Sequence, residues 1–275
     1  MSAARVGSGM YLGDATWPEA GTALSETDTA LVPVGSTEQH GPHLPLATDH
    51  IIAEGLARAA ADRADVVCTP TVTVGVSPHH RQFHGTLSID APTFRDYMES
   101  LSRSLVYQGI DRLIYVNAHG GNVEHLREVG RRLHDDDSAY AVEWMWDESI
   151  PELVDSLFER NGPHAGPKET SMVWYLADLV RADELEAARD DGCPDLEAVE
   201  TERNGARLYY DSIENAHNGA FGDPTDASAA KGERLFEAAT DQLVELAKWI
   251  ETRPWEAIGP RAHVRERDVS GDRNR

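Results

Sequence analysis

Short apolar runs alternate along the chain with longer segments in which apolar residues recur at helical spacing. The runs have the length and the valine content of buried strands, and they lie at 29–34, 66–74, 112–117 and 139–144. Helical spacing is found at 50–64, 93–108, 123–134, 168–179 and 232–252. Strands that alternate with amphipathic helices favour an α/β fold with a mostly parallel sheet flanked by helices. Segment 204–225 contains glycine and asparagine and fits neither pattern.

The length of 275 residues and the apolar content of 40% allow one large domain. We expect a single domain over 1–260 and a polar tail over 261–275. Cys68 and Cys193 lie far apart and in no metal-like spacing, which indicates free thiols in a reducing compartment. No window approaches about 20 consecutive apolar residues, and the first residues lack the apolar core of a signal peptide. These features predict a cytoplasmic protein without membrane contact.

Acidic residues outnumber basic ones by 48 to 25, and the net charge is −23. This balance argues against nucleic-acid binding, because phosphate neutralisation needs clustered lysine and arginine. Only Lys168, Lys231 and Lys248 are lysines, and the acidic residues are spread over nearly the whole length. Such a composition suits solvation in concentrated salt, where screening weakens self-repulsion. We expect a halophilic, archaeal cytoplasm; the alternative is an acidic protein from a mesophile.

Two polar motifs directly follow apolar runs. Glu38, His40 and Asp49 lie in a loop with several glycines and prolines after the run 29–34, and His119 follows the run 112–117. Since the carboxyl ends of parallel strands share one edge of a sheet, these side chains are expected to meet there. Carboxylate with imidazole suits Zn, Mn or Fe(II). The alternatives are a helix N-cap for Asp49 and a structural role for His119.

A third polar cluster places His164 before a proline turn and Glu169 in the first turn of an expected helix. Taken alone, Glu169 is more typical of a carboxylate that complements the helix dipole. A further loop holds His79, His80 and His84, an arrangement more often solvated than metal-binding.

These motifs together resemble the creatininase family of metal-dependent amidohydrolases. The resemblance rests on segments in the family's order, namely VPVGSTEQHGPHLPL at 32–46 with Asp49, FHGT at 83–86, NAHGGN at 117–122, HAG at 164–166 and ETS at 169–171. It implies a three-layer α/β/α sandwich assembled as a homo-oligomer, often a hexamer. It also implies two divalent metal ions per subunit, Zn, Mn or Fe(II).

The resemblance further implies a role for each motif residue. Asp49 would bridge the two metals, Glu38 and His119 would complete one site, and His40 and Glu169 the other. His164 would be the acid–base or substrate-orienting histidine. Two departures concern the substrate: Gly121 stands where creatininases have glutamate, and Arg160 where they have a tryptophan. Trp146 resembles a second creatininase tryptophan, but the missing aromatic wall disfavours creatinine.

Relatives with two glycines after the motif histidine include archaeal deformylases, so we expect deformylation of a formylamino-pyrimidine ribosyl monophosphate in riboflavin and F420 biosynthesis. For this small-molecule substrate the expected contacts are Arg81 and His80 near the phosphate, with Trp146 and Gly120. The alternatives within the family are creatinine hydrolysis and trimming of a mycofactocin-type peptide. The alternative from another class is a non-catalytic metal-binding assembly protein, which would have lost a ligand position.

Overall fold

The computed structural model describes residues 9–193 and 202–261, and its centre is a five-stranded parallel sheet. The strand order is β1-β3-β2-β4-β5. The bounds are β1 Met10–Tyr11, β2 Thr29–Val34, β3 Val67–Cys68, β4 Arg112–Asn117 and β5 Tyr140–Met145. β2 and β4 are buried along their whole length, as the continuous apolar runs indicate.

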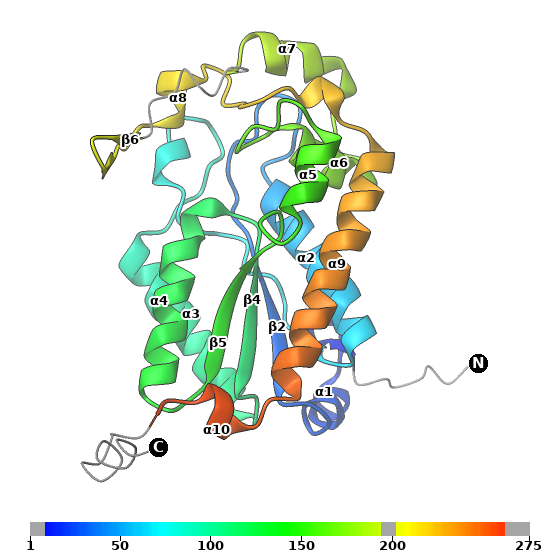
Figure 1. Ribbon diagram of the computed structural model, residues 1–275, viewed down its shortest axis with the longest axis vertical. Coiled ribbons are helices and arrows are strands. Elements are labelled where there is room, and N and C mark those ends of the chain that lie inside the picture. The colour runs from blue at the N-terminus through cyan, green and yellow to red at the C-terminus, as the bar shows by residue number, and fades with distance from the viewer. Residues whose placement is uncertain (1–8, 194–201, 262–275) are drawn as a thin grey trace, which may run out of the picture.

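Helices cover both faces of the sheet (Figure 1). α2 (Thr48–Ala64), α6 (Pro167–Leu176) and α9 (Ala229–Glu251) pack on one face. α3 (Ala91–Tyr107) and α4 (Val123–Asp135) pack on the other. Neighbouring residues of a strand alternate between the two faces, so that each face has its own apolar core. The expected three-layer α/β/α sandwich is confirmed.

Shorter elements complete the described chain. The helices are α1 (Trp17–Leu24), α5 (Pro151–Leu157), α7 (Leu185–Asp190), α8 (Ser212–Asn215) and α10 (Trp255–Ile258). The 3₁₀ turns include η2 (Pro78–His80) and η3 (Gly120–Asn122). A hairpin of β6 (Glu202–Arg203) and β7 (Ala206–Arg207) turns at Asn204 and Gly205, both with positive φ. Thus the segment left unassigned at 204–225 holds a hairpin strand, a short helix and turns.

The strand predicted at 66–74 is much longer than the strand that the structure has there. Only Val67 and Cys68 belong to β3, because Pro70 has no N–H for the ladder and the chain departs from the sheet there. It returns at Val72, whose N–H donates to Pro33 O over 2.9 Å. The tail expected at 261–275 lies outside the described residues except for Arg261. Among the described residues, no helix has the length and apolar character needed to span a membrane.

Candidate metal centre

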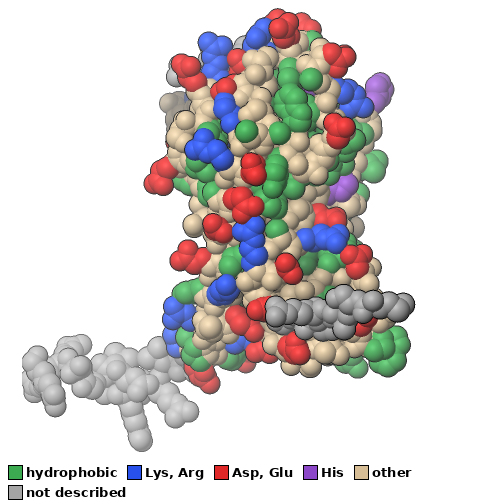
Figure 2. Space-filling model, turned by 90° about the vertical axis from the view of Figure 1, so that its right-hand side faces the viewer, with side chains coloured by type: hydrophobic (Ala, Val, Ile, Leu, Met, Phe, Trp, Pro, Cys, Tyr) green, Lys and Arg blue, Asp and Glu red, His purple; other side chains and the backbone are tan. Residues whose placement is uncertain are grey.

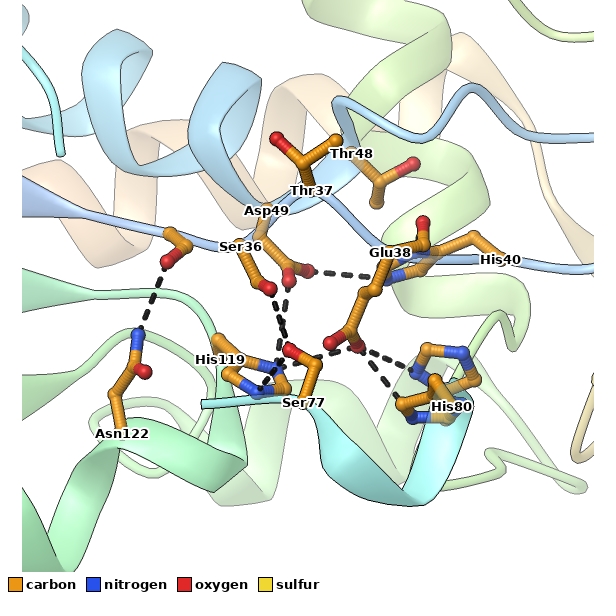
Figure 3. Close-up of polar contacts among 12 residues, drawn as sticks. Ser36, Thr37, Glu38, His40, Thr48, Asp49, Ser77, His80, His119 and Asn122 are labelled. Atoms are coloured by element: carbon orange, nitrogen blue, oxygen red, sulfur yellow. Dashed lines mark hydrogen bonds and ion pairs between the residues drawn. The ribbon is translucent and has the colours of Figure 1, made fainter. Parts of the chain in front are cut away.

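The register of the two central strands brings the first two polar motifs together. β2 and β4 pair with Val34 opposite Asn117, so the loops that follow both strands leave the sheet side by side. One loop carries Glu38 and His40, and the other carries His119 (Figure 3). The prediction that the two polar motifs meet at one edge of the sheet is therefore confirmed.

Close packing of the chain holds the first loop against its neighbours. A Cβ atom at Gly35 would lie 2.5 Å from the backbone nitrogen of His50, so only glycine allows the loop to lie on the start of α2. The Asn122 amide donates to Gly35 O over 3.0 Å and accepts from the Val76 N–H over 3.0 Å. Asn122 thus ties three segments of the chain together beside the centre.

Asp49 lies in the first turn of α2 and faces both histidines. His40 Nε2 is 3.0 Å from Asp49 Oδ1, and His119 Nδ1 is 3.4 Å from Asp49 Oδ2 (Figure 3). Glu38 Oε1 is 3.2 Å from His119 Nδ1. Glu169, in the first turn of α6, completes the other side, where its ligand atom lies within 4.8 Å of those of His40 and Asp49.

The five residues form two overlapping sets of possible ligands. One set is Glu38, Asp49 and His119, and the other is His40, Asp49 and Glu169. Both contain Asp49, which matches the bridging position that the resemblance implies. A third set combines Glu38 and His40 with His164.

Apart from the ion-pair contacts above, several of these candidate ligand atoms are buried without a hydrogen-bond partner, namely both carboxylate oxygens of Glu38, Oδ2 of Asp49 and Nε2 of His40. Leaving buried polar atoms unpaired is costly unless another group compensates. The outer nitrogens are paired: His40 Nδ1 lies 3.2 Å from Glu38 O, and His119 Nε2 lies 3.1 Å from Val76 O. Metal-binding histidines typically donate their second N–H in this way. The donor atoms therefore fit divalent cations.

Charges inside the centre perturb one another strongly. Burial lowers the pKa of His40, but the carboxylates of Asp49, Glu169 and Glu38 together outweigh it and raise this pKa to about 10. In the same way, Glu38, Asp49 and the Val76 carbonyl together outweigh burial and raise the pKa of His119 to about 9. Burial raises the pKa of Glu169 to about 7 against the attraction of His40. Without a cation, the imidazoles of His40 and His119 carry the positive charge of the centre.

The other predicted residues divide between two places. His164 and His80 join the centre: the rings of His40 and His164 are 4.2 Å apart, and His80 Nε2 is 3.5 Å from Glu38 Oε1. Gly120 and the buried Trp146 line a cavity of about 600 Å³ that also borders Glu169.

Arg81 lies apart from that cavity. It lines a separate pocket of about 570 Å³, where its guanidinium is 3.9 Å from Asp211, and its side chain is 70% exposed. His79, also in this pocket, contacts His80 with ring centroids 4.2 Å apart and ring planes tilted by 48°.

Sequence reasoning missed two groups beside the centre. Gln39, between the candidate ligands Glu38 and His40, is buried and contacts both His80 and His164. Lys168, next to Glu169, forms an ion pair of 2.5 Å with Asp147. Gln39 lies inside the long motif, but only the folded loop shows what its amide contacts. Lys168 and Asp147 are too far apart in sequence to suggest a pair.

A sequence model of the creatininase family, described as creatinine amidohydrolase, matches residues 13–247. The chain belongs to the creatininase family. Its members are metal-dependent amidohydrolases that act on C–N bonds, and this chain is an enzyme of that class.

Relatives in the family carry different names. A mycofactocin precursor peptide peptidase of Mycobacterium ulcerans is 35% identical over 245 residues, covering 85% of this chain and 86% of the relative. A 2-amino-5-formylamino-6-ribosylaminopyrimidin-4(3H)-one 5'-monophosphate deformylase of Methanothermobacter thermautotrophicus is 28% identical over 240 residues, covering 84% and 93%. A mutant creatininase solved with creatine has a TM-score of 0.74 at 23% identity, covering 89% and 99%, which supports the fold.

The glutamate that creatininases have at the position of Gly121 cannot be accommodated here. A Cβ atom at Gly121 would lie 2.2 Å from Val76 O and 2.5 Å from His119 Nε2. A side chain at position 121 would therefore require Val76 or His119 to move.

Proposed function

We propose that the protein hydrolyses an amide bond of a short peptide of the mycofactocin-precursor type, using two divalent metal ions. The observation that carries this proposal is the pair of buried ligand sets that share Asp49, found in a chain 35% identical to a mycofactocin precursor peptide peptidase. The choice of a peptide differs from the deformylation that we expected first from the sequence.

The ligands of one metal would be Glu38, Asp49 and His119, and those of the other His40, Asp49 and Glu169. Two divalent cations bound there supply charge that polarises an amide carbonyl and lowers the pKa of water. The cavity beside Glu169 would receive the substrate, with Gly120 and Trp146 in its wall.

His164 is suited to move the proton. Its Nε2 lies 2.7 Å from Gln39 O, a carbonyl that can only accept, so the proton of the neutral ring is on Nε2. Nδ1 is then bare and lies 3.6 Å from Glu38 Oε1. Burial and the neighbouring His40 and His80 lower the pKa of His164 well below its usual value, which keeps the ring neutral. His164 Nδ1 would accept a proton in the centre and deliver it to the departing nitrogen.

The cations that line the cavity disfavour a phosphorylated substrate. Lys168 Nζ is 2.5 Å from Asp147 Oδ2, and Arg127 Nε is 3.0 Å from Glu143 Oε2. A phosphate would have to displace these carboxylates, whereas the carbonyl groups of a peptide need no free cation. The charge pattern thus supports the peptide over the ribotide.

Deformylation of the pyrimidine ribotide is the second candidate. It is favoured by the match to the Methanothermobacter deformylase over 84% of this chain. Arg81, whose side chain is 70% exposed, is the cation that this reaction would use for the phosphate.

The two candidates are separated by offering the zinc- or manganese-loaded protein a mycofactocin precursor peptide, the formylamino-pyrimidine ribotide and creatinine in parallel. We expect mass spectrometry to find two peptide fragments whose summed mass exceeds the substrate by one water. Formate release from the ribotide with an intact peptide would contradict the peptidase and support the deformylase. A metal-loaded protein inert toward all three would favour the non-catalytic alternative.

A further inference from the structure

Four histidine rings surround Glu38 and Asp49, and one of them is held differently from the rest. The outer nitrogens of His40, His119 and His164 each meet a backbone carbonyl, at 3.2, 3.1 and 2.7 Å. A carbonyl can only accept, so each of these rings, when neutral, has its proton on the outer nitrogen and presents a bare nitrogen to the centre. The outer nitrogen of His80 meets the side-chain amide of Gln39 instead, and an amide can donate as well as accept.

The orientation of the Gln39 amide follows from its backbone contacts. Gln39 Oε1 lies 2.9 Å from the Gly41 N–H, which can only donate, and Nε2 lies 3.1 Å from Gly219 O, which can only accept. The two hydrogens of the NH₂ group are therefore donated to Gly219 O and His80 Nδ1. His164 Nε2, 2.9 Å from the same amide nitrogen, keeps its own proton for Gln39 O.

Gly219 keeps the amide in this place. Its φ is +83°, and a Cβ atom there would lie 1.8 Å from Gln39 Oε1. Only a glycine in this left-handed conformation lets the chain lie so close to the buried amide.

The amide sets the tautomer of His80. Gln39 Nε2 lies 2.8 Å from His80 Nδ1, so Nδ1 accepts and the ring proton is on Nε2. This Nε2–H points to Glu38 Oε1 across 3.5 Å, which is longer than an ordinary N–H···O hydrogen bond. Glu38 Oε1 has a shorter contact, of 3.2 Å, with His119. The His80 N–H is therefore free to serve a third oxygen placed between the rings.

We propose that His80 is not a metal ligand but the hydrogen-bond donor of the centre, offering Nε2–H to the carbonyl oxygen of the scissile amide. Gln39 is then a positioning residue, which acts by fixing the proton of His80 on Nε2. The role toward substrate rests on the proposed amidohydrolase function. A donor aimed at an oxygen that gains negative charge in the transition state accelerates the reaction without holding the substrate more tightly in the ground state.

The donor role is tested with His80→Phe, which keeps a ring for the contacts with His79 and His164 but removes both nitrogens. We expect an unchanged zinc content and a kcat lower by about 10²-fold, with KM changed little. A loss of zinc would overturn the proposal, because His80 would then support the metal. An unchanged kcat would overturn it as well.

The tautomer is tested without any substrate, so that its outcome is independent of the proposed function. Long-range ¹H–¹⁵N correlation spectra of the zinc-loaded wild type should show His80 protonated on Nε2 and bare on Nδ1. A proton on Nδ1, or a zinc-shifted nitrogen, would overturn the proposal.

Gln39→Glu removes the donating NH₂ group at nearly constant shape. In this variant the His80 proton should move to Nδ1, where it can donate to the new carboxylate. The matched control is Gln242→Glu, the same change at an exposed position of α9, which should leave the His80 signals as in the wild type. An unmoved proton in Gln39→Glu would show that the amide does not position the ring.

Discussion

At the scale of single residues, Asp49 has the central position in the candidate centre. It is 1% exposed, and its two carboxylate oxygens face different histidines, His40 and His119. The alternative role as an N-cap is wrong, because α2 begins at Thr48 and Ala47 precedes it as the cap residue. A buried carboxylate that caps no helix needs positive charge nearby, which the two proposed cations would provide.

Glu169 allows the cleanest test at this scale. Glu169→Gln keeps the size of the side chain but removes the negative charge, so we expect the bound metal to fall from two ions per chain toward one. Activity should be lost, while the melting temperature of the metal-free protein stays within a few degrees. Elemental analysis and thermal unfolding measure both, with Glu186→Gln on the exposed face of α7 as the control. Full activity with two ions would remove Glu169 from the ligands.

At the scale of elements, the turn from β4 into α4 sets the position of His119. Two adjacent glycines form its η3 segment and differ in the space around them. A Cβ atom at Gly120 would meet nothing within 4 Å, whereas one at Gly121 would meet Val76 O and the His119 ring. Because Gly121 has no side chain, the His119 ring can lie against its carbonyl partner, Val76 O.

The two glycines therefore form a matched pair of substitutions. Gly121→Ala should displace His119, destabilise the protein by about 1–3 kcal/mol through overpacking and weaken zinc binding. Gly120→Ala should keep both the melting temperature and the zinc affinity. Thermal unfolding and zinc titration measure the two effects; equal behaviour of the two variants would contradict this account of the turn.

The sequence predicted the elements that have long apolar patterns. It did not predict the short elements whose structure depends on contacts with distant parts of the chain. β2, β4 and the long helices follow from their own side chains. β1, a pair of residues at the sheet edge, has no pattern long enough to detect, and its partner β3 ends where Pro70 breaks the ladder.

The candidate site follows the same rule. The positions of the candidate ligands were predictable because the family motif contains them, and strand order explains why they lie together. The tautomers were not predictable, because they depend on contacts such as that of Gln39 with Gly219, which lie 180 residues apart in the chain. Arg81 shows the limit most clearly: its position in the loop beside His80 does not place it in the cavity that borders Glu169.

At the scale of the whole molecule, the charge of −23 is distributed over the surface. Acidic and basic side chains are interspersed over the face drawn in Figure 2. Many arginines pair with exposed carboxylates, as Arg131 does with Asp135 over 2.7 Å and Arg63 with Glu237 over 2.7 Å. Such surface pairs contribute little each, so they do not offset the excess of negative charge.

We therefore predict that added salt stabilises the fold. Raising KCl from about 0.1 M to about 1 M shortens the screening length from about 10 Å to about 3 Å and weakens the repulsion among carboxylates. The melting temperature should rise by several degrees, as followed by circular dichroism. A melting temperature that is constant or falls with KCl would support the alternative of an acidic protein from a mesophile.

The central claim is that one buried centre binds two divalent ions through a shared Asp49. The most direct test is a crystal structure of the zinc-loaded protein, with the ions located by anomalous diffraction at the zinc edge. We expect two peaks, one for an ion bound by Glu38, Asp49 and His119 and the other for an ion bound by His40, Asp49 and Glu169. A single peak, or a peak bound by His80, would contradict it.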